Sequence, residues 1–276
     1  MNSLSLGYSP CPNDTYVFYA LVHGRLAGAP KVDEVLEDIE TLNGMALRRE
    51  LDVVKVSFHA LGHMRRDYCL LHSGGALGRG CGPLVVGREP WGPDELEGRR
   101  IAIPGQMTTA ALLLRLFGAD RAELVEMPFH RIMPAAEAGE VDAGLIIHES
   151  RFTYQRHGLH KVVDLGEWWE AETGHPIPLG GILARRALGA DAIGRVDRAL
   201  RQSVEYAHAR SAEVKDYVRR HAQEMDEGVM RAHIDLYVND YTLDYGRDGE
   251  EAIQDLMRRA VEAGVLPAAT EPLFAA

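Results

Sequence analysis

The chain has 276 residues, of which 46% are hydrophobic and 26% are charged, and its formal net charge is −11. The length accommodates two domains, and the composition is ordinary for a globular protein. The acidity argues against a nucleic-acid partner, because phosphate binding needs a basic surface. An anionic ligand stays compatible with it, since a local site can oppose the overall charge.

Nothing in the sequence indicates export, a disulfide framework or membrane insertion. The first residues, Met1 to Leu6, contain no basic region followed by an apolar one, so we expect no signal peptide. No apolar run is long enough to span a membrane. The three cysteines, Cys11, Cys69 and Cys81, lack CxxC spacing and are odd in number. We therefore expect inert thiols in a cytoplasmic protein.

The predicted elements begin with a strand, a proline-containing loop and a helix. The strand is expected at residues 4–8, the loop at 9–14 and the helix at 15–21. Asn13 or Asp14 stands where the residue that caps the helix N-terminus belongs.

The same order of elements returns in the second half of the chain. A strand is expected at residues 100–104, a loop at 105–107 and a helix at 108–116, with Thr108 or Thr109 as its N-cap. Each of these two units is followed by a helix and then a strand, and these strands end at Ser57 and at His148. The repeated pattern predicts two related α/β halves, each with a mostly parallel sheet.

The chain is expected to pass twice between these halves. A stretch rich in proline, glycine and tryptophan after residue 88 indicates the first crossing, and residues 178–184 indicate the return. The remaining residues form periodic helices that should pack back onto the first half. The predicted domains are 1–88 plus 184–276 as the larger, discontinuous one and 89–183 as the smaller, inserted one, with a cleft between them.

The loops at 9–15 and 105–109 are candidate ligand sites, because both precede predicted helices. A helix N-terminus presents free N–H groups and a partial positive charge, which suit a carboxylate or a phosphate. Capping alone is the alternative for both loops. Two prolines flanking Cys11 favour a rigid, preorganised loop.

An apolar strand is predicted to end at His148, followed by Glu149 and Ser150. In open α/β sheets, ligands bind beyond the carboxyl ends of the strands. Histidine is also the side chain best suited to move a proton near neutral pH. We expect a chemical role for His148; the alternative is a histidine that only hydrogen-bonds a neighbouring carbonyl group.

Three further features have structural alternatives to a function. The glycine-dense segment 73–83 matches neither a Walker A loop nor a dinucleotide-binding fingerprint, so a turn or hinge is the simpler interpretation. His59 and His63 share one helix face but lack further metal ligands, which favours a packed or surface pair. Trp168 and Trp169 form either an aromatic wall or part of the core.

The chain resembles the 1,4-dihydroxy-6-naphthoate synthase family, which acts late in the futalosine route to menaquinone. The resemblance runs from Leu6 to about Arg186 and is looser in the helical tail. The segments that carry it, in chain order, are SPCPNDT, VKVSFHALG, SGGALGRGCGPLVV, IPGQMTTA, AGEVDAGLIIHESRFTY, DLGEWWE and PIPLGGILARR.

This resemblance implies a fold similar to type II periplasmic binding proteins, with two α/β domains around a cleft. It implies a carbon–oxygen lyase that converts cyclic dehypoxanthinyl futalosine to 1,4-dihydroxy-6-naphthoate. A base would start the removal of the sugar-derived fragment, and the ring would become aromatic. No redox cofactor and no metal ion are expected for this reaction.

The family's proposed base corresponds to His148, and its ligand-contacting hydroxyl groups correspond to Ser57 and to Thr108 or Thr109. We add four neighbouring residues as substrate-binding candidates: Ser9, Asn13, Ile147 and Gly180.

Two other functions are compatible with the same fold. A non-catalytic cytosolic protein could bind a small carboxylate ligand in the same cleft, although the lack of an export signal counts against a transport receptor. The sister enzyme chorismate dehydratase is the other alternative, and the SPCPNDT and GLIIHES segments point away from it. The oligomeric state is open, with a homodimer among the options.

Overall fold

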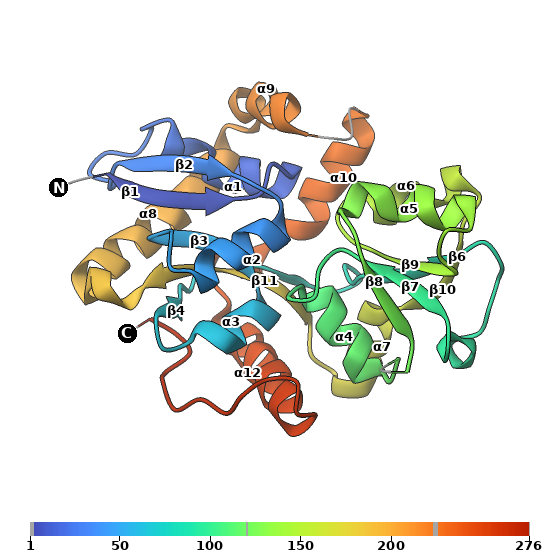
Figure 1. The fold of residues 1–276 in the computed structure, drawn as a ribbon. Coiled ribbons are helices and arrows are strands. Elements are labelled where there is room, and N and C mark those ends of the chain that lie inside the picture. The colour runs from blue at the N-terminus through green and yellow to red at the C-terminus, as the bar shows by residue number, and fades with distance from the viewer. Residues whose placement is uncertain (1–2, 120, 223–225, 276) are drawn as a thin grey trace.

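The computed structural model describes residues 3–119, 121–222 and 226–275. Within these residues the chain forms a six-stranded and a five-stranded sheet, which lie in two neighbouring α/β lobes (Figure 1). The prediction of two α/β halves is therefore confirmed.

The first sheet has the strand order β2-β1-β3-β11-β4, and β5 pairs with β11. Its strands are β1 (Leu4–Tyr8), β2 (Val32–Leu36), β3 (Val53–Ser57), β4 (Tyr68–Leu70), β5 (Ala76–Gly78) and β11 (Ile177–Arg185). The helices of this lobe are α1 (Pro12–Val22), α2 (Ile39–Leu47), α3 (Phe58–Met64), α8 (Ala190–Ala209), α9 (Ser211–His221), α10 (Glu227–Tyr237), α11 (Asp240–Leu243) and α12 (Gly246–Glu262), with the 3-10 turn η3 (Arg186–Leu188).

The second sheet has the order β10-β6-β9-β7-β8. Its strands are β6 (Leu84–Gly87), β7 (Arg100–Ile103), β8 (Glu123–Glu126), β9 (Ala143–Ile146) and β10 (His160–Asp164). The helices of this lobe are α4 (Thr109–Phe117), α5 (Phe129–Ala138), α6 (Ser150–Thr153) and α7 (Leu165–Thr173), with the 3-10 turns η1 (Pro93–Leu96) and η2 (Tyr154–His157).

Both sheets are mixed, so the prediction of mostly parallel sheets is wrong in part. The strands inside each half are parallel: β1 pairs with β2 and β3, and β7 pairs with β8 and β9. The strands that follow the crossings run antiparallel, β11 against β3, β4 and β5, and β6 against β9 and β10. A strand that enters from the opposite lobe reaches its sheet from the other end and so runs against its neighbours.

The crossings lie earlier in the chain than the expected boundaries at 88/89 and 183/184. β6 pairs with β9 and β10 of the second sheet, and β11 begins in the first sheet at Ile177. The apolar run of β6 resembles a strand of either half. The stretch after it connects two strands of the second lobe through η1 rather than joining the lobes.

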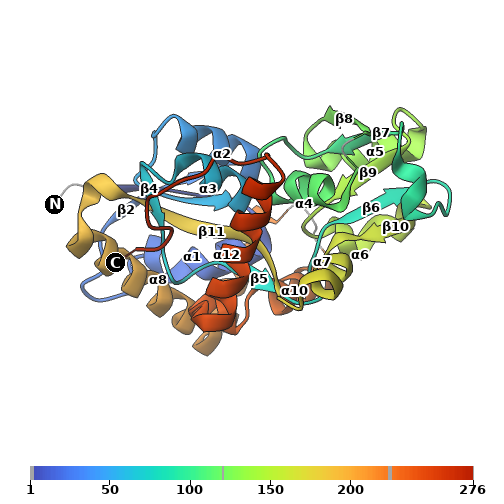
Figure 2. The same cartoon turned by 90° about the horizontal axis from the view of Figure 1, so that it is seen from below.

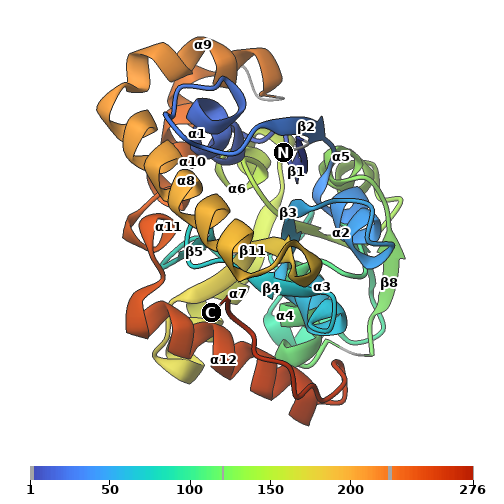
Figure 3. The ribbon, with the colours of Figure 1, turned by 90° about the vertical axis from the view of Figure 1, so that its left-hand side faces the viewer.

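The helical tail packs back onto the first lobe, as predicted. α8 and α1 lie against each other (Figure 3), and the buried Ser203 of α8 joins them. Its Oγ accepts the Leu21 N–H at 3.2 Å and donates to the Val17 carbonyl at 2.6 Å. On another face of the sheet, α12 contacts β11 and α3 (Figure 2). The discontinuous lobe is thus held together by both ends of the chain.

The N-terminal residues of α1 and α4 determine the conformation of the loops that precede these helices. α1 begins at Pro12 with Cys11 as its N-cap, so the prediction of Asn13 or Asp14 as cap is wrong. Proline suits the first helical position because its φ is preset and no N–H is needed there. α4 has Thr108 as its N-cap, and the Thr108 Oγ1 accepts the Ala111 N–H at 3.2 Å. Of the two predicted N-caps, Thr108 and Thr109, the first is therefore confirmed.

Gly82, in the glycine-dense segment, permits a close backbone contact beside the first crossing. A Cβ on Gly82 would lie 2.3 Å from the Gly166 nitrogen and 2.4 Å from its Cα. We expect Gly82→Ala to lower the free energy of unfolding by about 1–3 kcal/mol through overpacking, as measured by urea denaturation. Gly92→Ala is the matched control, because the nearest atom to its Cβ would be 3.7 Å away. An equal loss in both variants would contradict this explanation.

Candidate active site

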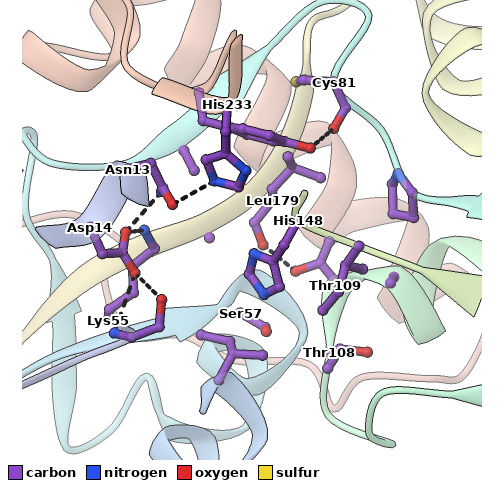
Figure 4. A pocket seen from close by; sticks show the side chains of 18 residues that line it. Asn13, Asp14, Lys55, Ser57, Cys81, Thr108, Thr109, His148, Leu179 and His233 are labelled. Atoms are coloured by element: carbon purple, nitrogen blue, oxygen red, sulfur yellow. Dashed lines mark hydrogen bonds and ion pairs between the residues drawn. The ribbon is translucent and has the colours of Figure 1, made fainter. Parts of the chain in front are cut away.

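A cavity with an empty volume of about 630 Å³ lies between the lobes (Figure 4). It adjoins the carboxyl ends of β1, β3 and β9, the position where ligands bind in open α/β sheets. All eight predicted site residues line it: Ser9, Asn13, Ser57, Thr108, Thr109, Ile147, His148 and Gly180.

His148 follows β9 in a backbone conformation that few residues other than glycine adopt. Its φ is +56°, in the left-handed region. The imidazole of His148 faces the cavity (Figure 4). The Phe129 ring packs against it edge-on, at a centroid distance of 5.4 Å. Such backbone outliers concentrate at functional sites.

The imidazole of His148 is available for proton transfer. Within the described part of the chain, neither ring nitrogen has a hydrogen-bond partner, so the predicted alternative of a bond to a neighbouring carbonyl is not observed. Burial lowers the pKa of His148 below its ordinary value of 6.5, more than nearby carboxylates such as Glu149 raise it. The ring is therefore neutral at pH 7 and can accept a proton.

Ser57 ends β3 and presents a hydroxyl group to the cavity. Asn43 of α2 positions it: the Asn43 Oδ1 accepts the Ser57 N–H at 2.9 Å, and the Asn43 Nδ2 donates to the Ser57 Oγ at 3.3 Å. The Ser57 O–H is left to donate to a ligand. Asn43 was not among the predicted residues, because a single asparagine in a helix carries no recognisable pattern.

The two threonines of the α4 loop use their hydroxyl protons within the protein. The Thr109 Oγ1 accepts the Phe58 N–H at 2.8 Å and donates to the Leu179 carbonyl at 2.5 Å. The Thr108 Oγ1 donates to the Gly105 carbonyl at 2.8 Å. A ligand that needs a hydroxyl donor from either threonine would have to displace these bonds.

What the start of α4 does offer is its backbone. The N–H groups of Thr109 and Ala110 lie in the first helical turn beside the cavity and have no partner among the described residues. Free N–H groups at a helix N-terminus bind carboxylates and phosphates. Residues of the first turn of α1, Asn13 and Asp14, line the same cavity, so both predicted loops meet at one site.

Ser9 and Asn13 belong to a buried polar network centred on Asp14. The Ser9 Oγ donates to the Asp14 Oδ2 at 2.7 Å, and the Asn13 Nδ2 donates to its Oδ1 at 2.9 Å. Lys55 of β3 forms an ion pair with the same carboxylate, and the two side chains are only 6% and 4% exposed. Sequence reasoning missed this pair, although a lysine inside the apolar run VVKVS is a signal that could have found it.

α10 adds two residues to the cavity wall that no sequence pattern indicated. The His233 Nε2 lies 2.9 Å from the Asn13 Oδ1, and the Tyr237 hydroxyl donates to the Cys81 carbonyl at 3.2 Å. Burial lowers the pKa of His233 well below 6.5. Because α10 has the periodicity of an ordinary amphipathic helix, only the fold brings it to the site.

The remaining candidates lie outside the cavity lining. His59 and His63 are 5.5 Å apart between ring centroids on α3. Trp169 is fully buried, and its Nε1 donates to the Pro176 carbonyl at 3.1 Å, so it is part of the core. No cluster of three or more metal-ligating side chains occurs in the described ranges. Among the helices described there, none is long and apolar enough to cross a membrane.

Two buried imidazoles predict a loss of stability in acid. Burial lowers the pKa of His59 to about 4 and that of His233 well below 6.5. As pH falls through about 6.5, these two imidazoles bind protons in the unfolded chain but stay neutral in the folded chain. The free energy of unfolding should therefore be retained above about pH 7 and fall below about pH 6.5, by up to about 1.4 kcal/mol per pH unit for each imidazole.

Urea unfolding across this pH range measures the effect, and His59→Asn should show a shallower slope than the wild type. A free energy of unfolding that does not change between about pH 7 and about pH 5 would contradict the expectation.

A family described as menaquinone biosynthesis matches residues 4–262. The chain therefore belongs to the menaquinone biosynthesis family. Within this family it is 54% identical to the 1,4-dihydroxy-6-naphthoate synthase of Streptomyces coelicolor, over 97% of this chain and 96% of the relative. It is 53% identical to the enzyme of the same name from Thermus thermophilus, over 99% and 100%. The family resemblance predicted from the sequence is confirmed.

Solved structures confirm the predicted fold. A crystal structure from Archaeoglobus fulgidus aligns with a TM-score of 0.91 and 36% identity, covering 96% of this chain and 98% of that one. The alkanesulfonate-binding protein of Xanthomonas axonopodis aligns with a TM-score of 0.71 and 15% identity, covering 99% and 96%. The second likeness shows the fold alone, which is that of the periplasmic binding proteins. This member of the menaquinone biosynthesis family thus has two α/β domains of that type around its cavity.

Proposed function

We propose that this protein is a lyase that converts cyclic dehypoxanthinyl futalosine to 1,4-dihydroxy-6-naphthoate. The observation that carries the proposal is the neutral His148 imidazole, which faces the interdomain cavity with both nitrogens free of partners in the described ranges. The names of two relatives at 53–54% identity support the substrate and the product. We place the reaction in the cytoplasm, where the three free thiols stay reduced.

In this proposal His148 takes a carbon-bound proton from the substrate. The released electron pair enters the ring, which becomes aromatic as the sugar-derived fragment leaves. The Thr109 and Ala110 N–H groups would bind the substrate carboxylate, and the Ser57 hydroxyl would orient the ring.

A cofactor-free assay tests the proposal directly. Purified protein is mixed with cyclic dehypoxanthinyl futalosine, and 1,4-dihydroxy-6-naphthoate is followed by chromatography. Product from the wild type is the expected result. Tight binding of the substrate without any product would instead support a cytosolic binding protein for a carboxylate ligand. Turnover of chorismate in place of the futalosine derivative would support the dehydratase alternative.

A further inference from the structure

Glu40, on α2 of the first lobe, reaches the loop that precedes α4 in the second lobe. Its Oε1 accepts the Met107 N–H at 2.9 Å, and its Oε2 accepts a hydrogen bond from the Asn43 Nδ2 at 3.0 Å. A Cβ on Gly105 of the same loop would lie 2.3 Å from the Glu40 Cδ, so only glycine leaves room for the carboxylate there. Burial raises the pKa of Glu40, and the two N–H donors oppose this rise by stabilising the charged form.

The hydrogen bonds of Asn43 determine which way its amide group points. The Ser57 N–H can only donate, so the Asn43 atom that meets it at 2.9 Å is the oxygen Oδ1. The Asn43 Nδ2 then donates to the Glu40 Oε2 and, at 3.3 Å, to the Ser57 Oγ. Because the Ser57 Oγ accepts this bond, its own proton is left for an acceptor in the cavity.

Glu40 thereby acts on both groups that the cavity offers to a ligand. Through one oxygen it holds the amide that sets the direction of the Ser57 hydroxyl group. Through the other it holds Met107, in the loop that leads into α4, whose first-turn N–H groups have no partner among the described residues. A second bond joins the same two segments, since the Thr109 Oγ1 accepts the Phe58 N–H at 2.8 Å. Ser57 and Thr109 both line the cavity (Figure 4).

We propose that Glu40 is a positioning residue, which fixes the spacing between the Ser57 hydroxyl group and the N–H groups of α4. This spacing would give the cavity its preference for a rigid ring ligand that carries a carboxylate. The inference rests on the proposed function, in which the α4 N–H groups bind the substrate carboxylate and Ser57 orients the ring. Two binding groups held at a fixed separation orient a rigid ligand at a lower entropic cost than two mobile ones.

Two ligands that differ only in the carboxylate test the proposal without turnover. 1,4-Dihydroxy-6-naphthoate carries the carboxylate and 1,4-dihydroxynaphthalene lacks it, and fluorescence titration under anaerobic conditions gives the Kd of each. The wild type should bind the first ligand more tightly. In Glu40→Ala this preference should fall by about 10-fold, because the loop before α4 loses a charge-assisted hydrogen bond. Glu37→Ala is the matched control, since Glu37 is exposed just before α2, and it should keep the wild-type preference.

The direction of the change separates positioning from charge. Glu40 carries a negative charge, so its removal alone would strengthen the binding of a carboxylate. A weaker preference for the carboxylate ligand in Glu40→Ala therefore identifies a loss of position. A stronger or an unchanged preference would overturn the inference.

Exchanging the two polar groups separates positioning from a structural role. The double variant Glu40→Gln with Asn43→Asp retains the formal charge, a hydrogen bond between the two side chains and an acceptor for the Met107 N–H. The carboxylate introduced at position 43 can only accept, so it turns the Ser57 hydroxyl proton away from the cavity. The Tm should exceed that of Glu40→Ala, whereas the Kd for 1,4-dihydroxy-6-naphthoate should stay about 10-fold above the wild-type value. Recovery of the affinity together with the Tm would show that Glu40 serves only the fold.

Turnover distinguishes a failure of this inference from a failure of the proposed function. The KM for cyclic dehypoxanthinyl futalosine should rise by about 10-fold in Glu40→Ala. If the wild type forms product and Glu40→Ala keeps its kcat and KM, the inference fails and the proposed function stands. If the wild type forms no product but the carboxylate preference falls in Glu40→Ala, the proposed function fails and the positioning role stands. A wild type that binds both ligands equally well would refute the carboxylate site, and the inference with it.

Discussion

Replacing His148 by alanine is expected to lower kcat for 1,4-dihydroxy-6-naphthoate formation by about 10²–10⁴-fold, the usual contribution of a general base. The reason is that His148 is neutral and faces the cavity with both ring nitrogens free of described partners. The loss should be in kcat more than in KM, because the interaction between His148 and the transferred proton forms only in the transition state. Steady-state kinetics with the purified variant measures it.

His160→Ala is the matched control, since this histidine is exposed on β10 of the same lobe. Its kcat and KM should equal those of the wild type. The His148 variant should also retain its folded state, because its side chain makes no hydrogen bond to another described residue. Turnover near the wild-type rate in folded His148→Ala would show that another group removes the proton.

The position of the site could be predicted because strand ends are local features. The run that becomes β9 ends at His148, and the run that becomes β3 ends at Ser57, so sheet geometry brings both to one edge. The family resemblance then identified the same residues. The loops before α1 and α4 could be placed for the same reason, since each follows a strand directly.

The partners of these residues could not be predicted, because they depend on contacts between distant segments. His233 reaches Asn13 only because the helical tail folds back over α1, a separation of 220 residues. The roles of the two threonine hydroxyls were also hidden. The bond from Thr109 to the Leu179 carbonyl exists because β11 passes beneath the start of α4.

The lobe boundaries were misplaced for a related reason. The run that becomes β6 is apolar on both faces, and a fully buried strand fits either sheet equally well. The choice is made by pairing with β9 and β10, which the sequence of β6 alone does not encode. Local patterns therefore indicate that a strand exists, while the neighbouring strands decide where it lies.

The buried ion pair of Lys55 and Asp14, beside the cavity, is expected to have a large effect on the free energy of unfolding. Removing one partner of a buried ion pair leaves an uncompensated charge, which typically costs about 3–5 kcal/mol. Lys55→Met should lower the free energy of unfolding by this amount, as measured by urea denaturation. Asp14 would keep its bonds from Ser9 and Asn13 but lose its only cationic partner in the described ranges.

The double variant Asp14→Asn with Lys55→Met distinguishes the charge from the packing. Replacing a buried pair by neutral groups of similar size is often nearly neutral, so most of the lost stability should return. The exposed pair of Arg247 and Glu251 is the control, and Arg247→Met should leave the unfolding midpoint unchanged. If the double variant is no more stable than Lys55→Met, the loss comes from packing and not from the unpaired Asp14 carboxylate.

Because Asp14 also orients Asn13 and through it His233, recovery of stability without recovery of kcat would show that the network serves the reaction as well as the fold.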